Sequence, residues 1–315
     1  MQKRCLIQTT FVGYGDLLAH TPLIRFLQGI HEEVHVWTNN PDPFLYNPRV
    51  AMLLKPHGPT IPDASDFYYN NVFHVSGRAR NLAHSHMDIV DFMTISGYGC
   101  QLRPQDKHLE LFWPKRDEEL VSRMLWQYRV EPGKFVVVAP TTSWRSRTLP
   151  FEFYDRLITE LARRTKVVLV GKDVNPLHMS PHSTHLAATE MKGTYDGKRF
   201  LQKNVVNLMG QLTFSQLGYL YSQAFAAINT ENGNMLASCT NDTCWNIYIP
   251  MVTPPEFRLP YRHGSQTFKT SVVEVADPYY PALDCNLGRE SVPLTNAPTR
   301  LPTVEAVLEA YDAVA

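Results

Sequence analysis

Apolar runs of strand length alternate with helix-like segments along most of this chain. Phe135–Ala139 is one continuous apolar run, and residues 166–171 hold another. Between them, apolar side chains recur every three or four positions from Phe151 to Leu161, which is the spacing of one helix face. Strand, loop, helix and strand within about 35 residues predict a βαβ unit. Such units build a parallel sheet whose loops gather at the carboxyl ends of the strands.

The same alternation continues toward both ends of the chain. Residues 5–9 and 34–38 predict strands on either side of a buried helix, in which Pro22 marks the first turns or a kink. Further strands are predicted at residues 67–69, 72–75, 109–112, 205–208, 224–229, 245–249 and 272–275. Further helices are predicted at residues 86–93, 117–128, 186–191, 213–221, from 235 onward, and at 302–311. Residues 39–62 are rich in proline and asparagine, and we expect them to be irregular.

These units fall into two groups, which predicts two domains. At 315 residues the chain exceeds the usual size of one domain. We predict an N-terminal domain over residues 1–130, a C-terminal domain over residues 131–300 and a terminal helix over residues 301–315. The boundary between the domains is expected between Trp113 and Gly133. The expected fold class is α/β, with two Rossmann-like domains whose parallel sheets face each other across a cleft.

The charge balance disfavours a protein that depends on bulk attraction to nucleic acid or to an anionic membrane. The 30 basic and 30 acidic residues cancel, so a nucleic-acid partner would have to be met through a local patch. The 5 cysteines are odd in number and include no CxxC pair, which favours reduced thiols and a cytoplasmic location. No apolar run approaches the length of about 18 residues that a membrane span needs, so we expect no transmembrane segment.

The loop at residues 140–150 has the composition of an anion-binding site. It is rich in hydroxyl groups and leads into a helix N-terminus, where unpaired N–H groups and the helix dipole favour an anion. We therefore expect it to bind a diphosphate. The candidate donors are the hydroxyl groups of Thr141, Thr142 and Ser143 and the forked guanidinium of Arg147, with Arg145 as the alternative cation.

A second polar loop follows the apolar run at residues 224–229. It consists of Thr230, Glu231, Asn232, Gly233 and Asn234. The helix that begins after it can receive a phosphate at its N-terminus, and Glu231 can accept hydrogen bonds from ribose or sugar hydroxyls. The alternative is an ordinary capping loop. Lys172 and Asp173 follow another strand end, and we expect them to line the nucleotide pocket.

The first predicted strand is followed by a glycine turn, Gly13, Tyr14, Gly15 and Asp16. Its glycines let the backbone turn sharply and approach a ligand closely. Asp16 stands where the next helix begins, so capping of that helix is one interpretation of this residue.

Several of these segments, in this order and at this spacing, resemble glycosyltransferase family 9, the heptosyltransferase family. Residues 13–16 followed by residues 21–27 resemble its N-terminal signature. The other resembling segments are residues 86–98, 140–150, 207–213 and 230–237. The resemblance runs from Leu6 to about Ile249. It implies the GT-B fold and a transferase that moves a sugar from a nucleoside-diphosphate donor to an acceptor hydroxyl with inversion.

The resemblance also implies roles for individual residues. It identifies Asp16 as the catalytic base and Gly13, Tyr14 and Gly15 as the acceptor-side loop. The sequence departs from the family pattern in the second polar loop, where the acidic residue is either Asn229 or Glu231 and the following histidine is absent. Arg147 stands where heptosyltransferases typically carry lysine. ADP-heptose itself is therefore not implied, and a hexosyl, heptosyl or pentosyl donor stays open.

We expect no metal and no cofactor besides the donor substrate. No DxD motif stands in a suitable loop. The histidines at 84 and 86 do not share a helix face, and those at 178, 182 and 185 are better spaced, but Pro181 breaks the helix that would align them. The arginine and the helix ends would then neutralise the diphosphate. The acceptor can be a glycan, a modified base in DNA or a protein. Two other classes fit the same frame: a sugar-nucleotide-binding scaffold that has lost catalysis, and an epimerase or phosphorylase.

Overall fold

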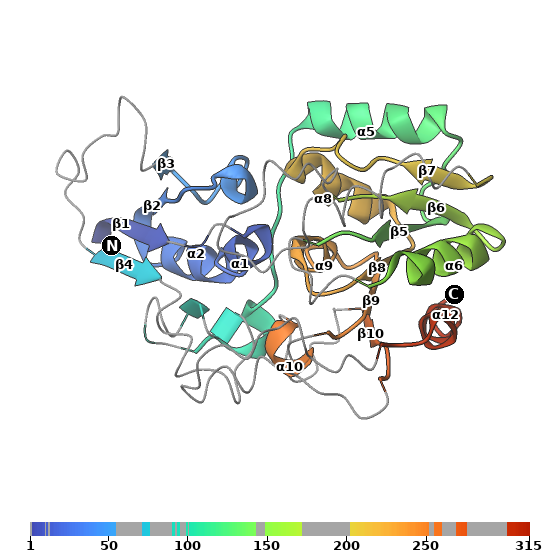
Figure 1. Ribbon diagram of the computed structural model, residues 1–315. Coiled ribbons are helices and arrows are strands. Elements are labelled where there is room, and N and C mark those ends of the chain that lie inside the picture. Colours follow the sequence, from blue (N-terminus) through green and yellow to red (C-terminus); the bar gives the residue numbers. More distant parts are fainter. Residues whose placement is uncertain are drawn as a thin grey trace.

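The computed structural model describes residues 2–9, 11, 13–54, 71–75, 90–91, 93–94, 99, 101–142, 149–171, 202–251, 255–259, 269–275 and 301–315. Within these residues the chain forms two sheets, one in each half of the molecule (Figure 1). All strand pairs between the described residues are parallel. The predicted α/β class with two Rossmann-like units is confirmed.

The N-terminal sheet has the strand order β3-β2-β1-β4. Its strands are β1 (Gln2–Thr9), β2 (His31–Trp37), β3 (Met52–Leu54) and β4 (Asn71–Val75). Two helices, α1 (Tyr14–Leu18) and α2 (Thr21–Gln28), connect β1 to β2. Because the chain builds outward from β1 to β3 and then returns to β4, the strand order reverses beside β1. Open α/β sheets bind ligands at such a switch point, outside the carboxyl ends of the strands.

The C-terminal sheet has the order β10-β9-β8-β5-β6-β7. Its strands are β5 (Phe135–Ala139), β6 (Lys166–Leu169), β7 (Val205–Asn207), β8 (Ala226–Asn229), β9 (Trp245–Tyr248) and β10 (Thr270–Val272). The chain proceeds from β5 outward to β7 and returns to β8 on the other side of β5. The switch point of this sheet therefore lies between β5 and β8, where both predicted polar loops begin.

Helices cover both faces of the C-terminal sheet because alternate residues of β5 point to opposite sides. Phe135 and Val137 belong to the apolar cluster that includes α8 (Phe214–Gln223) and α9 (Gly233–Ser238). Val136 and Val138 belong to a second cluster, with α6 (Phe151–Ala162) and α12 (Val304–Asp312). A capping box begins α8, because Thr213 and Gln216 each accept a hydrogen bond from the other's backbone N–H group.

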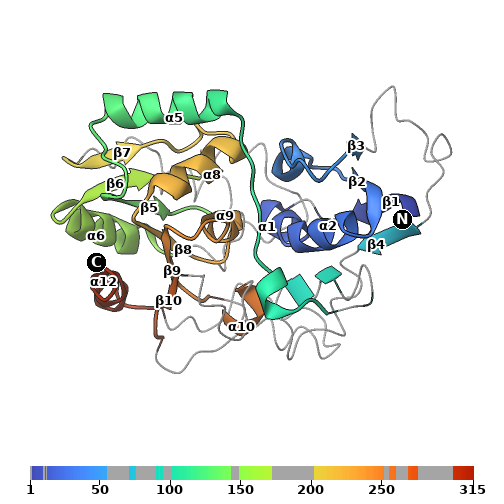
Figure 2. The same ribbon diagram turned by 180° about the vertical axis from the view of Figure 1, so that it is seen from behind.

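The chain crosses from one sheet to the other in the segment before α5 (Lys115–Gln127), and α5 packs against α8 (Figure 2). Ser215 Oγ donates a hydrogen bond of 2.6 Å to Asp117 Oδ2, and Gln216 Nε2 donates one of 3.2 Å to Asp117 Oδ1. Helix α5 is thus fastened to the C-terminal sheet's helical layer. The crossing lies at the start of the interval in which the domain boundary is expected, and the domain limits themselves stay predictions.

Three predicted elements differ from the structure. The strand at residues 109–112 is wrong, because within the described residues this segment pairs with no strand; Glu110 instead gives its N–H to Thr21 Oγ1 at 2.9 Å. The irregular stretch at residues 39–62 contains β3, an edge strand of 3 residues. The strand at residues 272–275 is β10, which begins and ends earlier.

Other differences concern helices. The single helix expected around Pro22 is divided into α1 and α2, and Pro22 lies in the first turn of α2, where proline costs no backbone hydrogen bond. Helix α10 (Pro255–Arg258) lies in a proline-rich stretch for which no element is predicted. The elements predicted at residues 67–69 and 186–191, and most of the helix at 86–93, lie outside the described residues. Among the helices that are described, none combines the length and the apolar character that crossing a bilayer requires.

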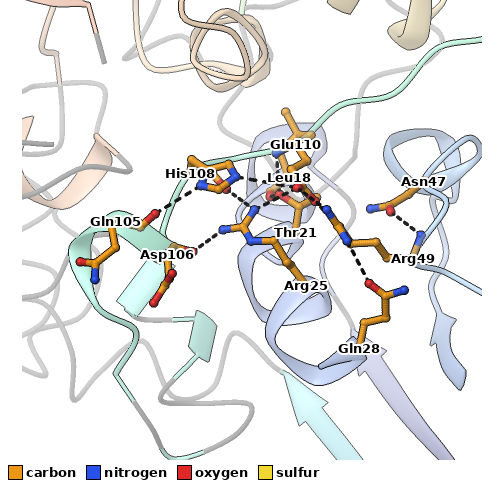
Figure 3. A network of polar contacts seen from close by, with 10 residues as sticks. All are labelled: Leu18, Thr21, Arg25, Gln28, Asn47, Arg49, Gln105, Asp106, His108 and Glu110. Atoms are coloured by element: carbon orange, nitrogen blue, oxygen red, sulfur yellow. Dashed lines mark hydrogen bonds and ion pairs between the residues drawn. The ribbon is translucent and has the colours of Figure 1, made fainter. Parts of the chain in front are cut away.

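A network of charged side chains holds the crossing segment against the N-terminal sheet's helices (Figure 3). The carboxylate of Glu110 lies between two arginines: Arg25 Nη1 is 3.1 Å from Oε1, and Arg49 Nε is 3.0 Å from Oε2. Arg25 also donates to the backbone oxygens of Asp106 and His108. Glu110 is only 11% exposed, so both guanidinium groups depend on this carboxylate for compensation.

Replacing Glu110 with alanine should destabilise the protein. The change leaves two partly buried guanidinium groups without their carboxylate, which typically costs about 1.5–3 kcal/mol. Urea unfolding at neutral pH measures the difference. Glu131→Ala serves as the control, since Glu131 and its partner Lys134 are 70% and 74% exposed, and its unfolding midpoint should equal that of the wild type. Equal midpoints for both variants would contradict an anchoring role for the network.

Candidate active site

The predicted site residues follow strands that border the two switch points. Gly13, Tyr14, Gly15 and Asp16 follow β1, Thr141 and Thr142 follow β5, and Thr230 to Asn234 follow β8. Figures 1 and 2 both show α1 and α9 lying next to each other between the two sheets. The loops that the sequence assigns to the acceptor and to the donor therefore meet at the middle of the molecule.

Two glycines make this meeting possible. A Cβ atom on Gly15 would lie 3.4 Å from the Cα of Gly233 and 3.0 Å from Leu236 Cδ1, and one on Gly233 would lie 3.3 Å from the backbone nitrogen of Gly15. Such distances are tight even for a methyl group, so the absence of side chains at both positions lets the backbones touch. Helices α1 and α9 approach each other directly as a result.

Tyr14 reinforces the contact between the halves. Its ring stacks on Phe214 of α8 with the ring centroids 4.4 Å apart. Its hydroxyl donates a hydrogen bond of 2.9 Å to Asp42 Oδ2, beyond the end of β2. Burial, together with this carboxylate, raises the pKa of Tyr14 to about 12, so the hydroxyl keeps its proton at neutral pH. Tyr14 therefore does not titrate in the physiological range.

Asp16 lies in the first turn of α1, at the edge of the same junction. Its side chain is 18% exposed, and its Oδ1 atom lies 3.4 Å from Nη1 of Arg258, the last residue of α10. The structure shows no side-chain cap at the start of α1, where Gly13 is the N-cap residue. The ion pair with Arg258 turns the Asp16 carboxylate toward the C-terminal half.

The side chain of His20 is hydrogen-bonded to the backbone of Asp16. Its Nδ1–H donates a hydrogen bond of 2.8 Å to the carbonyl oxygen of Asp16, and its ring packs edge-on against Phe11. Complete burial lowers the pKa of His20 to about 4, although the nearby oxygen acts in the opposite direction. The imidazole is thus neutral at physiological pH and acts as a fixed hydrogen-bond donor.

Of the residues predicted to bind the donor, Thr141 and Thr142 come after β5, with Pro140 between. Thr141 is buried, and a Cβ atom on Gly171, after β6, would lie 2.8 Å from its Oγ1. Gly171 has a φ of +123°, a conformation that other residues avoid, so the backbone there can pass close to the threonine hydroxyl. Thr142 is half-buried. The remaining candidates Ser143, Arg145, Arg147, Lys172 and Asp173 lie outside the described residues, and their roles stay predictions.

The loop after β8 is held in place by its own side chains. Glu231 is completely buried, and its Oε1 accepts a hydrogen bond of 2.9 Å from the backbone N–H of Met251. Asn232 caps α9, with its Oδ1 atom 3.1 Å from the N–H of Met235. Asn229 is buried as well and bonds Ser238 and Asn246. Asn232 thus has the helix-capping role that is the alternative interpretation of this loop. A ligand contact by Glu231 stays a prediction.

Arg258 is the residue of this junction that sequence reasoning does not find. It belongs to a helix of 4 residues that starts with a proline, in a stretch without strand or helix periodicity. An isolated arginine there gives no local signal. The described residues include no cluster of three or more histidine, cysteine, aspartate or glutamate side chains able to hold a metal ion.

No protein-family model matches the chain, and no curated protein matches its sequence. Solved structures match it along almost their whole length. The glycosyl transferase family 9 protein from Veillonella parvula DSM 2008 superposes with a TM-score of 0.69 at 12% identity, over 99% of this chain and 97% of that one. The E. coli ADP-heptose LPS heptosyltransferase II gives 0.59 at 16% identity over 98% of both chains. E. coli heptosyltransferase WaaC with ADP gives 0.55 at 14% identity, over 99% of this chain and 100% of that one.

The chain has the GT-B fold. In this arrangement the carboxyl ends of two parallel sheets face one another. The contact between α1 and α9 places Asp16 at that boundary. Within the GT-B fold, the predicted catalytic aspartate and the start of the second polar loop are thus brought together.

Replacing His20 with glutamine should reduce the loss of stability in acid. Between pH 6.5 and about 4 the unfolded chain binds a proton at His20 that the folded protein does not bind, so stability falls as the pH decreases through this window. The wild type should lose about 3 kcal/mol more than the variant across it, because one pKa unit corresponds to about 1.4 kcal/mol.

Urea unfolding at pH 7 and at pH 4.5 measures this effect. His108→Gln is the control, because His108 is 51% exposed, and it should follow the wild type. A His20→Gln curve parallel to that of the wild type at both pH values would show that His20 is not buried in its neutral form.

Proposed function

We propose that this chain is a cytoplasmic glycosyltransferase that moves a sugar from a nucleoside-diphosphate donor to an acceptor hydroxyl, with inversion and without a metal ion. One observation carries the proposal. In a chain with the GT-B fold, a partly exposed aspartate at one switch point touches an arginine from the opposite half, beside the contact of Gly15 with Gly233. A sugar transfer needs a general base near the acceptor hydroxyl, and a carboxylate at such a junction can serve as that base.

Asp16 supplies the base in this proposal. Its carboxylate accepts the proton of the acceptor hydroxyl as the oxygen attacks the anomeric carbon, while the bond to the diphosphate breaks on the opposite face. A single displacement of this kind inverts the configuration. The hydrogen bond from His20 to the carbonyl oxygen of Asp16 holds the base in place, which favours a fixed geometry of attack.

The C-terminal half supplies the donor site. The hydroxyls of Thr141, Thr142 and Ser143 and the guanidinium of Arg147 hydrogen-bond and neutralise the departing diphosphate, so no divalent ion is needed. Lys172, Asp173 and the loop from Thr230 to Asn234 line the nucleotide. The similar E. coli heptosyltransferase WaaC has been solved with ADP, which makes ADP the first nucleotide to test.

The N-terminal half supplies the acceptor site, beside Gly13, Tyr14 and Gly15. Stacking on Phe214 and the hydrogen bond to Asp42 hold the ring of Tyr14 rigidly, so this side of the site has a fixed wall. We propose a glycan hydroxyl as the acceptor, as in a heptosyltransferase-like enzyme. The zero formal net charge supports a glycan over DNA, which normally requires a surplus of basic residues.

A panel of nucleoside diphosphates and their sugars tests the donor class by thermal shift. A ligand at about 100 times its Kd should stabilise the folded protein by about 2.7 kcal/mol. The donor's own base should stand out, with ADP expected first. If no nucleoside diphosphate shifts the unfolding temperature, the proposed donor class is wrong.

Asp16→Asn then tests the chemistry with the donor found in that panel. Transfer should fall by about 10²–10⁴-fold, the usual contribution of a general base, while nucleotide binding is retained. Asp312→Asn is the matched control, since this carboxylate lies on α12 and pairs with Arg164, and its rate should equal that of the wild type with or without chelator. Binding without transfer from any donor would favour the scaffold, and free sugar-1-phosphate as product would favour a phosphorylase.

A further inference from the structure

Arg258 crosses the junction between the two halves of the molecule. It comes from α10 in the C-terminal half, and its Nη1 lies 3.4 Å from Oδ1 of Asp16 in the N-terminal half. The arginine side chain is 9% exposed and the aspartate side chain 18% exposed. An arginine this deeply buried needs an anionic partner, because desolvation of an isolated charge is unfavourable.

Among the described residues, the ion pair with Asp16 leaves most of the N–H donors of the Arg258 guanidinium without an acceptor. A guanidinium carries five N–H donors in a rigid planar fork. Within the part of the chain that the structure describes, its hydrogen bond to Asp16 is long and single, and its buried Nε atom has no hydrogen-bond partner. Buried donors without a partner are rare in folded proteins, and one beside a proposed active site indicates a group that a ligand completes.

The location restricts what that ligand can be. Nε belongs to a cation that touches the proposed base, and α10 follows β9, which lies next to β8 and its polar loop. An oxyanion that reaches this place from the donor side would satisfy the free donor and share the positive charge with Asp16. A planar fork suits the paired oxygens of a phosphate group.

We propose that Arg258 is an anion-binding residue of the donor site that also positions Asp16. In the absence of donor its guanidinium holds the carboxylate of Asp16, and with a nucleoside-diphosphate donor bound its Nε–H donates to a phosphate oxygen. The inference rests on the proposed function, because it takes a nucleoside diphosphate as the ligand. Asp16 and the ligand then compete for one cation, so the two sites are coupled.

Isothermal titration with ADP, and with inorganic pyrophosphate as a probe that does not depend on the base, tests this assignment. Arg258→Gln should weaken both ligands by about tenfold or more, whereas adenosine, which lacks phosphate, should bind both proteins alike. Arg258→Lys keeps the positive charge but lacks the planar guanidinium, so its loss of affinity for ADP and pyrophosphate should be smaller than that of Arg258→Gln. This variant also serves if the glutamine variant does not fold.

The coupling gives a second readout that a merely structural role would not produce. Asp16→Asn removes the competing carboxylate, so it should tighten ADP binding several-fold in a protein with Arg258 and leave it unchanged in the Arg258→Gln background. Unchanged ADP affinity in Arg258→Gln, with a wild type that binds ADP, overturns the role of Arg258 and leaves the proposed function in place. A wild type that binds no nucleoside diphosphate overturns both.

Discussion

The contact between the backbones of Gly15 and Gly233 sets the distance between the two halves of this protein. Neither residue has a side chain, so α1 and α9 approach until backbone atoms meet, as the 3.3 Å spacing of a Cβ on Gly233 from the nitrogen of Gly15 indicates. Around this point the apolar interior is continuous, and one cluster includes Ile7 of the first sheet and Val137 of the second. The two halves therefore share packed apolar contacts around this point, which fix the position of one half relative to the other.

The proposed sugar transfer at the junction depends on that rigidity. A base is effective only when its carboxylate stays within hydrogen-bond reach of the attacking hydroxyl, and a shift of about 1 Å can cost about 10²-fold in rate. Asp16 is restrained on its backbone by His20 and on its side chain by Arg258. Farther away, the carboxylate of Glu110 fastens the crossing segment to α2, and Asp117 fastens α5 to α8. These contacts fasten the chain on both sides of the segment where it crosses between the halves.

Much of the fold was predictable because most strands are apolar on both faces and most helices have one apolar face. The capping box of Thr213 is equally local, since both partners lie in one turn. The strand prediction for residues 109–112 was wrong because alternate side chains there are buried, which gives a period of two even though no neighbouring strand among the described residues supplies hydrogen bonds. Strand β3 is too short to leave a pattern. Arg258 was beyond local reasoning altogether, because its partner Asp16 lies in the other half of the chain and only the assembled fold brings the two together.

A double-mutant cycle on Gly15→Ala and Gly233→Ala, read by urea unfolding, tests the backbone contact most directly. Each methyl group alone must push α1 and α9 apart, which should cost about 1–3 kcal/mol. Once the helices have separated, the second methyl group enters space that the first has opened, so the double variant should be more stable than the sum of the single effects predicts, by about 0.5 kcal/mol or more. Strictly additive losses would show that the two glycines do not meet and that the halves are joined in another way.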